Sequence, residues 1–236
     1  VACVVTPVSA QMPAGWTARD IGSPAAAGSV QYDQTTGAWT IRGNGTGIRG
    51  TSDQFYFVYQ TLSGDGELTA RVASLEPPLA DWSMAGVMIR VLLIPESPYA
   101  FMGISANTET GTHGLTFWGR TAPAGIAENE STGPMTAPYW VRISRVGDTF
   151  AGFTSPDGKE WTQRYRATES GIPKSIYIGY AVTSEAGGKL VTAVFDNGPT
   201  KATTPNPADK AGDVVTPLLR WTGGVTATAH DVPRQT

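Results

Sequence analysis

Acidic residues that stand close together in the chain are the first candidates for chemistry. Asp65 and Glu67 are separated by one residue, and so are Glu128 and Glu130. Glycoside hydrolysis needs two carboxylates about 5–10 Å apart, one as acid and one as base or nucleophile. Asp65 and Glu67 flank a glycine-rich hairpin turn, and we expect Glu128 and Glu130 in a loop. Both pairs are therefore predicted to be solvated and not catalytic.

Histidine and cysteine give little scope for nucleophilic or metal chemistry. The chain has two histidines, His113 in a glycine-rich turn and His230 near the C-terminus, and one cysteine, Cys3. A Ser-His-Asp triad needs a histidine held between two partners, and zinc takes three or four nitrogen or sulfur ligands. One cysteine excludes an internal disulfide. The sequence predicts no catalytic residue, no cofactor and no enzyme activity.

Calcium is the one metal for which the sequence offers ligands. It binds carboxylate oxygens near loops and strand ends, and Asp53, Asp157 and Asp196 occupy such positions. Two of them also have a structural alternative, since Asp53 can cap a turn and Asp157 can hydrogen-bond within its own turn.

Aromatic side chains are the candidates for ligand binding. An exposed aromatic ring with polar neighbours can stack on a sugar, and we expect Trp82, Trp118, Tyr99 and Trp39 to be exposed. Trp82, at the end of the Pro-rich segment 77–82, is the first choice. The alternative is that each ring covers a sheet edge or one end of the core.

The composition predicts one folded β-domain. The chain has 236 residues, which suits a single β-sandwich, and its 28 Gly and 17 Pro supply many turns. The net charge is −3, and no run of Lys or Arg could follow a phosphate backbone. We therefore expect no nucleic-acid partner.

Strand patterns dominate, and helical periodicity is almost absent. Turn motifs such as Gly64–Gly66, Pro156–Gly158 and Gly187–Gly188 separate the apolar segments. Alternation of polar and apolar residues indicates antiparallel sheets with one buried face. The predicted strands are 54–60, 67–72, 85–91, 99–104, 114–118, 139–145, 149–154, 175–182 and 189–196.

Four ordered sequence blocks carry a family resemblance. They are Gly64–Val72, Met84–Arg90, Tyr139–Arg145 with Ser155–Trp161, and Tyr177–Gly179 with Phe195–Asn197. Together they resemble the concanavalin-A-like jelly-roll domains of many secreted bacterial proteins, related in fold to laminin-G and to lectin and glucanase modules. The resemblance covers Gly15 to Pro199. It implies an all-β, two-sheet antiparallel jelly-roll sandwich and says little about function, because such domains occur mostly as appended modules.

The two ends of the chain differ from this domain. We divide the chain into an apolar N-terminal arm (1–12), the jelly-roll domain (13–200) and a Pro/Thr-rich extended tail (201–236). Val1–Cys3 resembles the end of a lipobox, which makes Cys3 a candidate lipid anchor. Val8–Ala10 resembles a signal-peptide cleavage site instead, and a third alternative is an arm docked on a partner. No apolar stretch reaches the ~20 residues that a spanning helix needs.

Three functional hypotheses follow. The first is a non-catalytic, extracytoplasmic scaffold subunit that binds other proteins of a membrane-associated complex through its arms, because segments of this composition fold by burying surface on a partner. The complex could be respiratory, photosynthetic or secretory. The alternative is a carbohydrate-binding module that uses Trp82 or Trp118. A glycoside hydrolase is the remote third, because no suitable carboxylate spacing is present.

Overall fold

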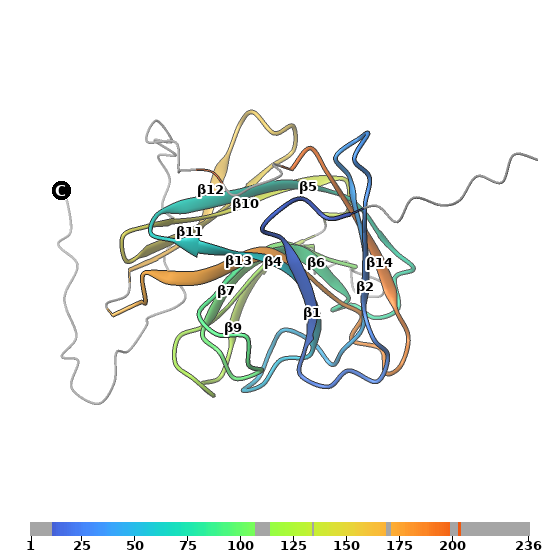
Figure 1. The fold of residues 1–236 in the computed structure, drawn as a ribbon, viewed down its shortest axis with the longest axis horizontal. Coiled ribbons are helices and arrows are strands. Elements are labelled where there is room, and N and C mark those ends of the chain that lie inside the picture. Colours follow the sequence, from blue (N-terminus) through green and yellow to red (C-terminus); the bar gives the residue numbers. More distant parts are fainter. Residues whose placement is uncertain (1–10, 107–113, 134, 169–170, 199–202, 204–236) are drawn as a thin grey trace, which may run out of the picture.

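The computed structural model describes residues 11–106, 114–133, 135–168, 171–198 and 203. Fourteen strands form two seven-stranded sheets, and every pair of neighbouring strands is antiparallel. No helix is present within these ranges. Figure 1 shows the sheets face to face, with β12, β10 and β5 above β13, β4 and β6. The predicted two-sheet antiparallel jelly-roll sandwich is confirmed.

Each sheet combines strands from distant parts of the chain. Sheet A contains, in spatial order, β1 (Thr17–Ile21), β4 (Phe55–Ser63), β13 (Ser175–Thr183), β6 (Met84–Arg90), β7 (Tyr99–Ser105), β8 (Leu115–Arg120) and β9 (Glu128–Thr132). Sheet B contains β12 (Thr162–Thr168), β11 (Thr149–Ser155), β10 (Tyr139–Val146), β5 (Gly66–Glu76), β14 (Val191–Asp196), β3 (Trp39–Gly43) and β2 (Ser29–Tyr32).

Nine of these strands were predicted from the sequence, and five were not. The missed strands are β1, β2, β3, β9 and β12, which are four to seven residues long. β9 has the sequence ENEST, so no apolar residue marks it. The prediction that Glu128 and Glu130 lie in a loop is wrong, because both belong to this edge strand.

The main hydrophobic core lies between the sheets. Strands β5 and β14 bury alternate residues, as expected for strands with one covered face. Trp16, Trp39 and Tyr180 pack together in this core, with Trp16 stacked on Tyr180 at a centroid distance of 5.2 Å. The expectation that Trp39 is exposed is therefore wrong, since only 1% of it is accessible.

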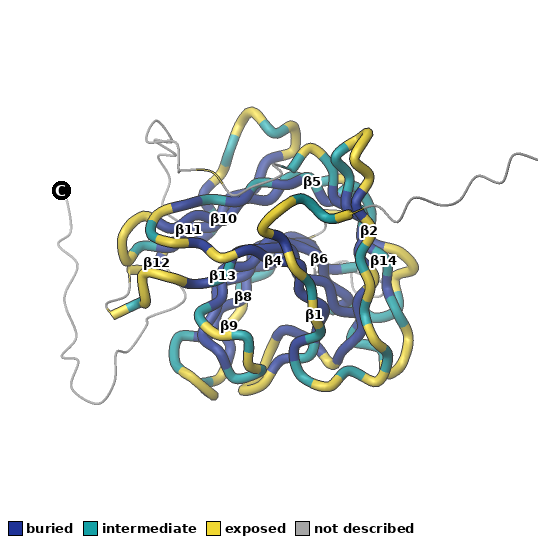
Figure 2. Tube along the Cα trace, viewed as in Figure 1, coloured by how far each residue is buried: buried dark blue, intermediate teal, exposed yellow. Residues whose placement is uncertain are grey.

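A second hydrophobic cluster lies on the outer face of sheet A, the face turned away from sheet B. It includes Phe57, Met88, Phe101 and Trp118, together with Ile48 from a connecting loop. Residues on both faces of β6, β7 and β8 are consequently buried. Figure 2 shows buried strands in both sheets and exposed residues concentrated in the connections.

Few residues of the predicted terminal arms are described. Met12 packs against the main core, and Thr203 pairs with Glu67 of β5 through two backbone hydrogen bonds of 2.7 and 3.1 Å. These ends of the arms contact the domain itself. Residues 1–10, with Cys3, and 204–236 lie outside the described residues. No helix in the described chain is long and apolar enough to cross a membrane.

Candidate functional site

A row of large side chains crosses the outer face of sheet A. The strand register places Trp118 opposite Phe101, and Phe101 opposite Met88. Met88 and Tyr59 both lie opposite Gly179, so the row continues to β4. Asn129 of β9 follows Trp118 at the other end. Alternation along each strand points these residues away from the main core.

Trp82 and Trp118 form an aromatic corner. Their ring centroids are 5.6 Å apart and their planes are inclined by 77°. Trp118 is 8% exposed and Trp82 is half-buried. The Nε1 of Trp118 has no hydrogen-bond partner in the described structure. Two of the four predicted aromatics therefore come together, from β8 and from the connection between β5 and β6.

Neutral polar groups lie beside this corner. The Oγ1 of Thr116 and the Oγ of Ser131 are 3.0 Å apart, and the Nδ2 of Asn129 donates to the same Ser131 oxygen over 3.4 Å. Asn129 is exposed and Ser131 is half-buried. Strand β9 thus presents an amide and a hydroxyl group next to the corner, while Thr116 of β8 is fully buried behind them.

A buried ionic network holds the loops beside this face. The carboxylate of Asp53 accepts hydrogen bonds from Arg90 at 2.7 Å and from Arg120 at 2.6 and 2.8 Å, and all three side chains are fully buried. Burial raises the pKa of Asp53, while the hydrogen bonds from Arg120 and the charge of Arg90 oppose that rise.

The two arginines also bind backbone carbonyls of three loops. Arg90 donates to Pro95, and Arg120 donates to Gly50, Ser97 and Gly125. The loops before β4, after β6 and after β8 are thereby tied together. Sequence analysis missed this network. The sequence feature that points to the network is an arginine at the last position of each of two apolar strands, Arg90 in β6 and Arg120 in β8.

Tyr99 belongs to the same buried region. It is 1% exposed, and its hydroxyl donates to the carbonyl of Ile48 over 2.9 Å. The guanidinium of Arg120 lies 5.0 Å from its ring centroid. The prediction that Tyr99 is an exposed binding residue is therefore wrong, because loops cover it.

Charged side chains are scarce on the outer face of sheet A. Among its described strand positions the register places only Arg19, Arg90 and Arg120, and no Asp or Glu. Arg90 and Arg120 are buried against Asp53. The remaining charged residue at these strand positions is Arg19, which is exposed on edge strand β1. The strand residues of this face are therefore aromatic and almost neutral.

The chain was compared with known proteins. No family model and no curated protein matches it. A functionally unknown protein from Saccharomyces cerevisiae is 16% identical, with a TM-score of 0.62 over 83% of this chain and 100% of its own. An alginate lyase from Klebsiella pneumoniae is 10% identical, with a TM-score of 0.51 over 81% and 95% of the two chains. The carbohydrate-binding module CBM66 from Bacillus subtilis is 15% identical, with a TM-score of 0.49 over 81% and 98%.

The fold is a concanavalin-A-like jelly roll. Identities this low establish a shared fold and nothing more.

The three predicted calcium ligands lie in different parts of this jelly roll. Asp53 is held by two arginines, and Asp196 accepts two hydrogen bonds from Arg71 at 2.7 and 2.8 Å. Asp157 accepts from the backbone of Lys159 at 2.8 Å within the β11–β12 turn. Across the described ranges, no group of three His, Cys, Asp or Glu residues could hold a metal ion. The structure thus does not join these three residues into a calcium site.

The acidic pairs also have structural positions. Asp65 is exposed and accepts a hydrogen bond from the backbone of Gly147 at 2.7 Å, which connects two neighbouring turns. Glu128 and Glu130 lie opposite Gly119 and Phe117 on edge strand β9. Both histidines, His113 and His230, lie outside the described residues.

Proposed function

We propose that this jelly roll binds a carbohydrate chain at the Trp82–Trp118 corner, beside β9 on the outer side of sheet A, and does not cleave it. The observation that carries the proposal is the Trp82–Trp118 corner, in which the buried Nε1 of Trp118 lacks a partner. Aromatic rings stack on the apolar faces of sugars, and an indole N–H seeks an acceptor when it is buried. A sugar stacked on Trp82 with a hydroxyl oxygen at Trp118 would satisfy both requirements.

The groups around the corner support a sugar ligand. Asn129 and Ser131 offer donors and acceptors without charge, and the buried Thr116 lies against Ser131. Binding sites of this kind combine an apolar surface with a few polar groups that fix orientation. The alginate lyase that shares the fold is named for a polysaccharide substrate, which agrees with a polysaccharide ligand here.

The absence of Asp and Glu from the strand positions of this face supports binding over hydrolysis. Hydrolysis by the usual mechanism needs a pair of carboxylates on either side of the scissile bond.

The scaffold hypothesis depends on the two terminal arms, and the structure describes only a small part of each. Met12 and Thr203, which belong to these parts, contact the jelly-roll domain itself. We therefore place carbohydrate binding ahead of it. An extracytoplasmic location suits a polysaccharide ligand, and lipidation of Cys3 stays a prediction.

The test is affinity electrophoresis of the full chain in gels that contain different polysaccharides. We expect retardation by at least one of them, at least about tenfold weaker binding for Trp82→Ala, and about three- to tenfold weaker binding for Trp118→Phe, which keeps a ring and removes the N–H. Trp161→Phe is the control, because Trp161 packs on Arg142 of sheet B. Failure of every polysaccharide to retard the wild-type chain would refute the proposal.

A further inference from the structure

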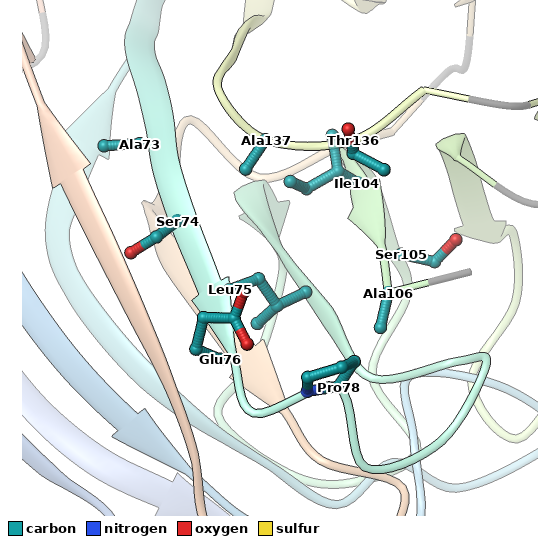
Figure 3. A pocket seen from close by; sticks show the side chains of 10 residues that line it. All are labelled: Ala73, Ser74, Leu75, Glu76, Pro78, Ile104, Ser105, Ala106, Thr136 and Ala137. Carbon is teal, nitrogen blue, oxygen red and sulfur yellow. The ribbon is translucent and has the colours of Figure 1, made fainter. Parts of the chain in front are cut away.

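A cavity of about 270 Å³ opens at one end of the sandwich, where a strand of each sheet finishes. The end of β5 supplies residues 73–76, and the end of β7 with the residue after it supplies 104–106. Pro78 and residues 136–137, from two connecting segments, complete the lining. Figure 3 shows Ile104 and Ala137 on one side of the space, with Leu75 and Glu76 on the other.

The inner part of the cavity is apolar. Leu75 and Ile104 belong to the main hydrophobic core, and Ala137 packs against that core. A ligand here can bury a hydrocarbon surface against side chains that the fold already holds in place. The volume lies below the usual range of about 300–1,000 Å³ for drug-sized ligands. It therefore suits one ring or a short alkyl group.

The polar part of the lining carries one charge. Ser74, Ser105 and Thr136 are neutral, and Glu76 is the sole ionisable residue among the ten that line the cavity. Glu76 is exposed, and no residue of the described structure forms a hydrogen bond or ion pair with its side chain. Ser105 is buried, and its Oγ donates to the carbonyl of Gly114 over 3.4 Å.

From this lining we infer a second ligand site, specific for a compact primary amine such as a 2-amino sugar. The ammonium group donates to the Glu76 carboxylate, and the carbon skeleton packs against Leu75, Ile104 and Ala137. Hydrogen bonds between ionised partners are about twice as strong as neutral ones, so the amine is favoured over its neutral analogue. An anionic compound is repelled by Glu76. This inference goes beyond the proposed polysaccharide site and does not depend on it.

The probes are D-glucosamine, N-acetyl-D-glucosamine and D-glucose, titrated into the full chain and followed by NMR through the methyl groups of Ile104, Ala106 and Ala137. We expect saturable shifts with D-glucosamine and about a three- to fivefold loss of affinity when its amine is acetylated or replaced by hydroxyl, because the Glu76 carboxylate is exposed. Glu76→Gln keeps the shape of the side chain, and we expect it to weaken D-glucosamine binding by a similar factor. Ala137→Val reduces the space and should weaken binding without removing the charge.

Two controls separate this site from other effects. Glu128→Gln removes an exposed carboxylate that does not line the cavity and should leave D-glucosamine binding unchanged. Trp82→Ala should also leave it unchanged, because the polysaccharide site is a different one. Equal binding of D-glucose and D-glucosamine, no saturable shift, or full binding by Glu76→Gln would each overturn the inference. Loss of polysaccharide binding alone would count only against the proposed function.

Discussion

Asp53 is a fully buried carboxylate between two fully buried arginines. The Asp53→Asn substitution keeps the size of the side chain and removes the charge that balances Arg90 and Arg120. Uncompensated buried charges are costly, and breaking such a pair destabilises proteins by about 3–5 kcal/mol. We expect a decrease of this size in the free energy of unfolding, measured by urea denaturation.

The exposed Asp148 gives a matched control for this measurement. Asp148→Asn should change the free energy of unfolding by less than about 0.5 kcal/mol, as is usual for surface sites. Equal stability of the Asp53 and Asp148 variants would show that the buried network does not hold the loops.

The exposure of a single aromatic side chain was only partly predictable from the sequence. Trp82 and Trp118 were singled out with Tyr99 and Trp39, and only the first two come together on one face. Aromatic residues occur on both faces of these strands, and loops cover part of the outer face. Whether a ring is exposed therefore depends on how distant segments pack over it, and the local sequence pattern carries no information about that packing. The pairing of Asp53 with Arg120, 67 residues later, is hidden for the same reason.

At the scale of elements, β6 and β7 approach so closely that a side chain at Gly86 would not fit. A Cβ there would lie 2.3 Å from the carbonyl oxygen of Met102. We expect Gly86→Ala to reduce the free energy of unfolding by about 1–3 kcal/mol, because the two backbones must move apart. Gly187→Ala, with no atom within 4 Å of the added carbon, is the control and should be nearly neutral by the same urea measurement. A neutral Gly86→Ala would contradict the close strand approach.

The ion pair between Arg71 and Asp196 connects β5 to β14 beside an irregularity in their register. The hydrogen bond from Arg71 lowers the pKa of Asp196, and burial opposes it. Because the folded-state pKa is below the unfolded value of about 3.9, the pair stabilises the fold above that pH and the contribution is lost as pH falls through the folded-state pKa.

We therefore expect Asp196→Asn to be less stable than wild type by up to about 1 kcal/mol near neutral pH, since the pair is partly exposed. The difference should shrink below about pH 4. Thermal unfolding of both proteins across this range measures it. A difference that stays constant into acid would show that the charge of Asp196 is not responsible.

The strands predicted from the sequence are six to eleven residues long, and the missed ones are four to seven. The sequence of β5 alternates buried and half-buried residues, and β14 does the same, so periodicity identified both. β9 lies at the edge of sheet A and contains only polar residues, so it forms because β8 offers it an unpaired edge. Strands of this kind are defined by their neighbour and not by their own side chains.

At the scale of the whole molecule, charge bears on which polysaccharides the proposed site would bind. The net charge is −3, and the outer face of sheet A has one exposed charged strand residue, Arg19, at its edge. An anionic chain such as alginate would meet no row of cations there. Aromatic stacking and neutral hydrogen bonds depend little on ionic strength, whereas attraction between exposed charges is screened at a Debye length of about 10 Å in 0.1 M salt. We therefore expect tighter binding of a neutral β-glucan or mannan than of alginate.

Affinity electrophoresis at about 0.05 and 0.5 M NaCl should give nearly equal affinities for the neutral chain, and Arg19→Gln should leave that affinity unchanged. Tightest binding to alginate, weakened strongly by salt and by Arg19→Gln, would show instead that the ligand lies along the β1 edge.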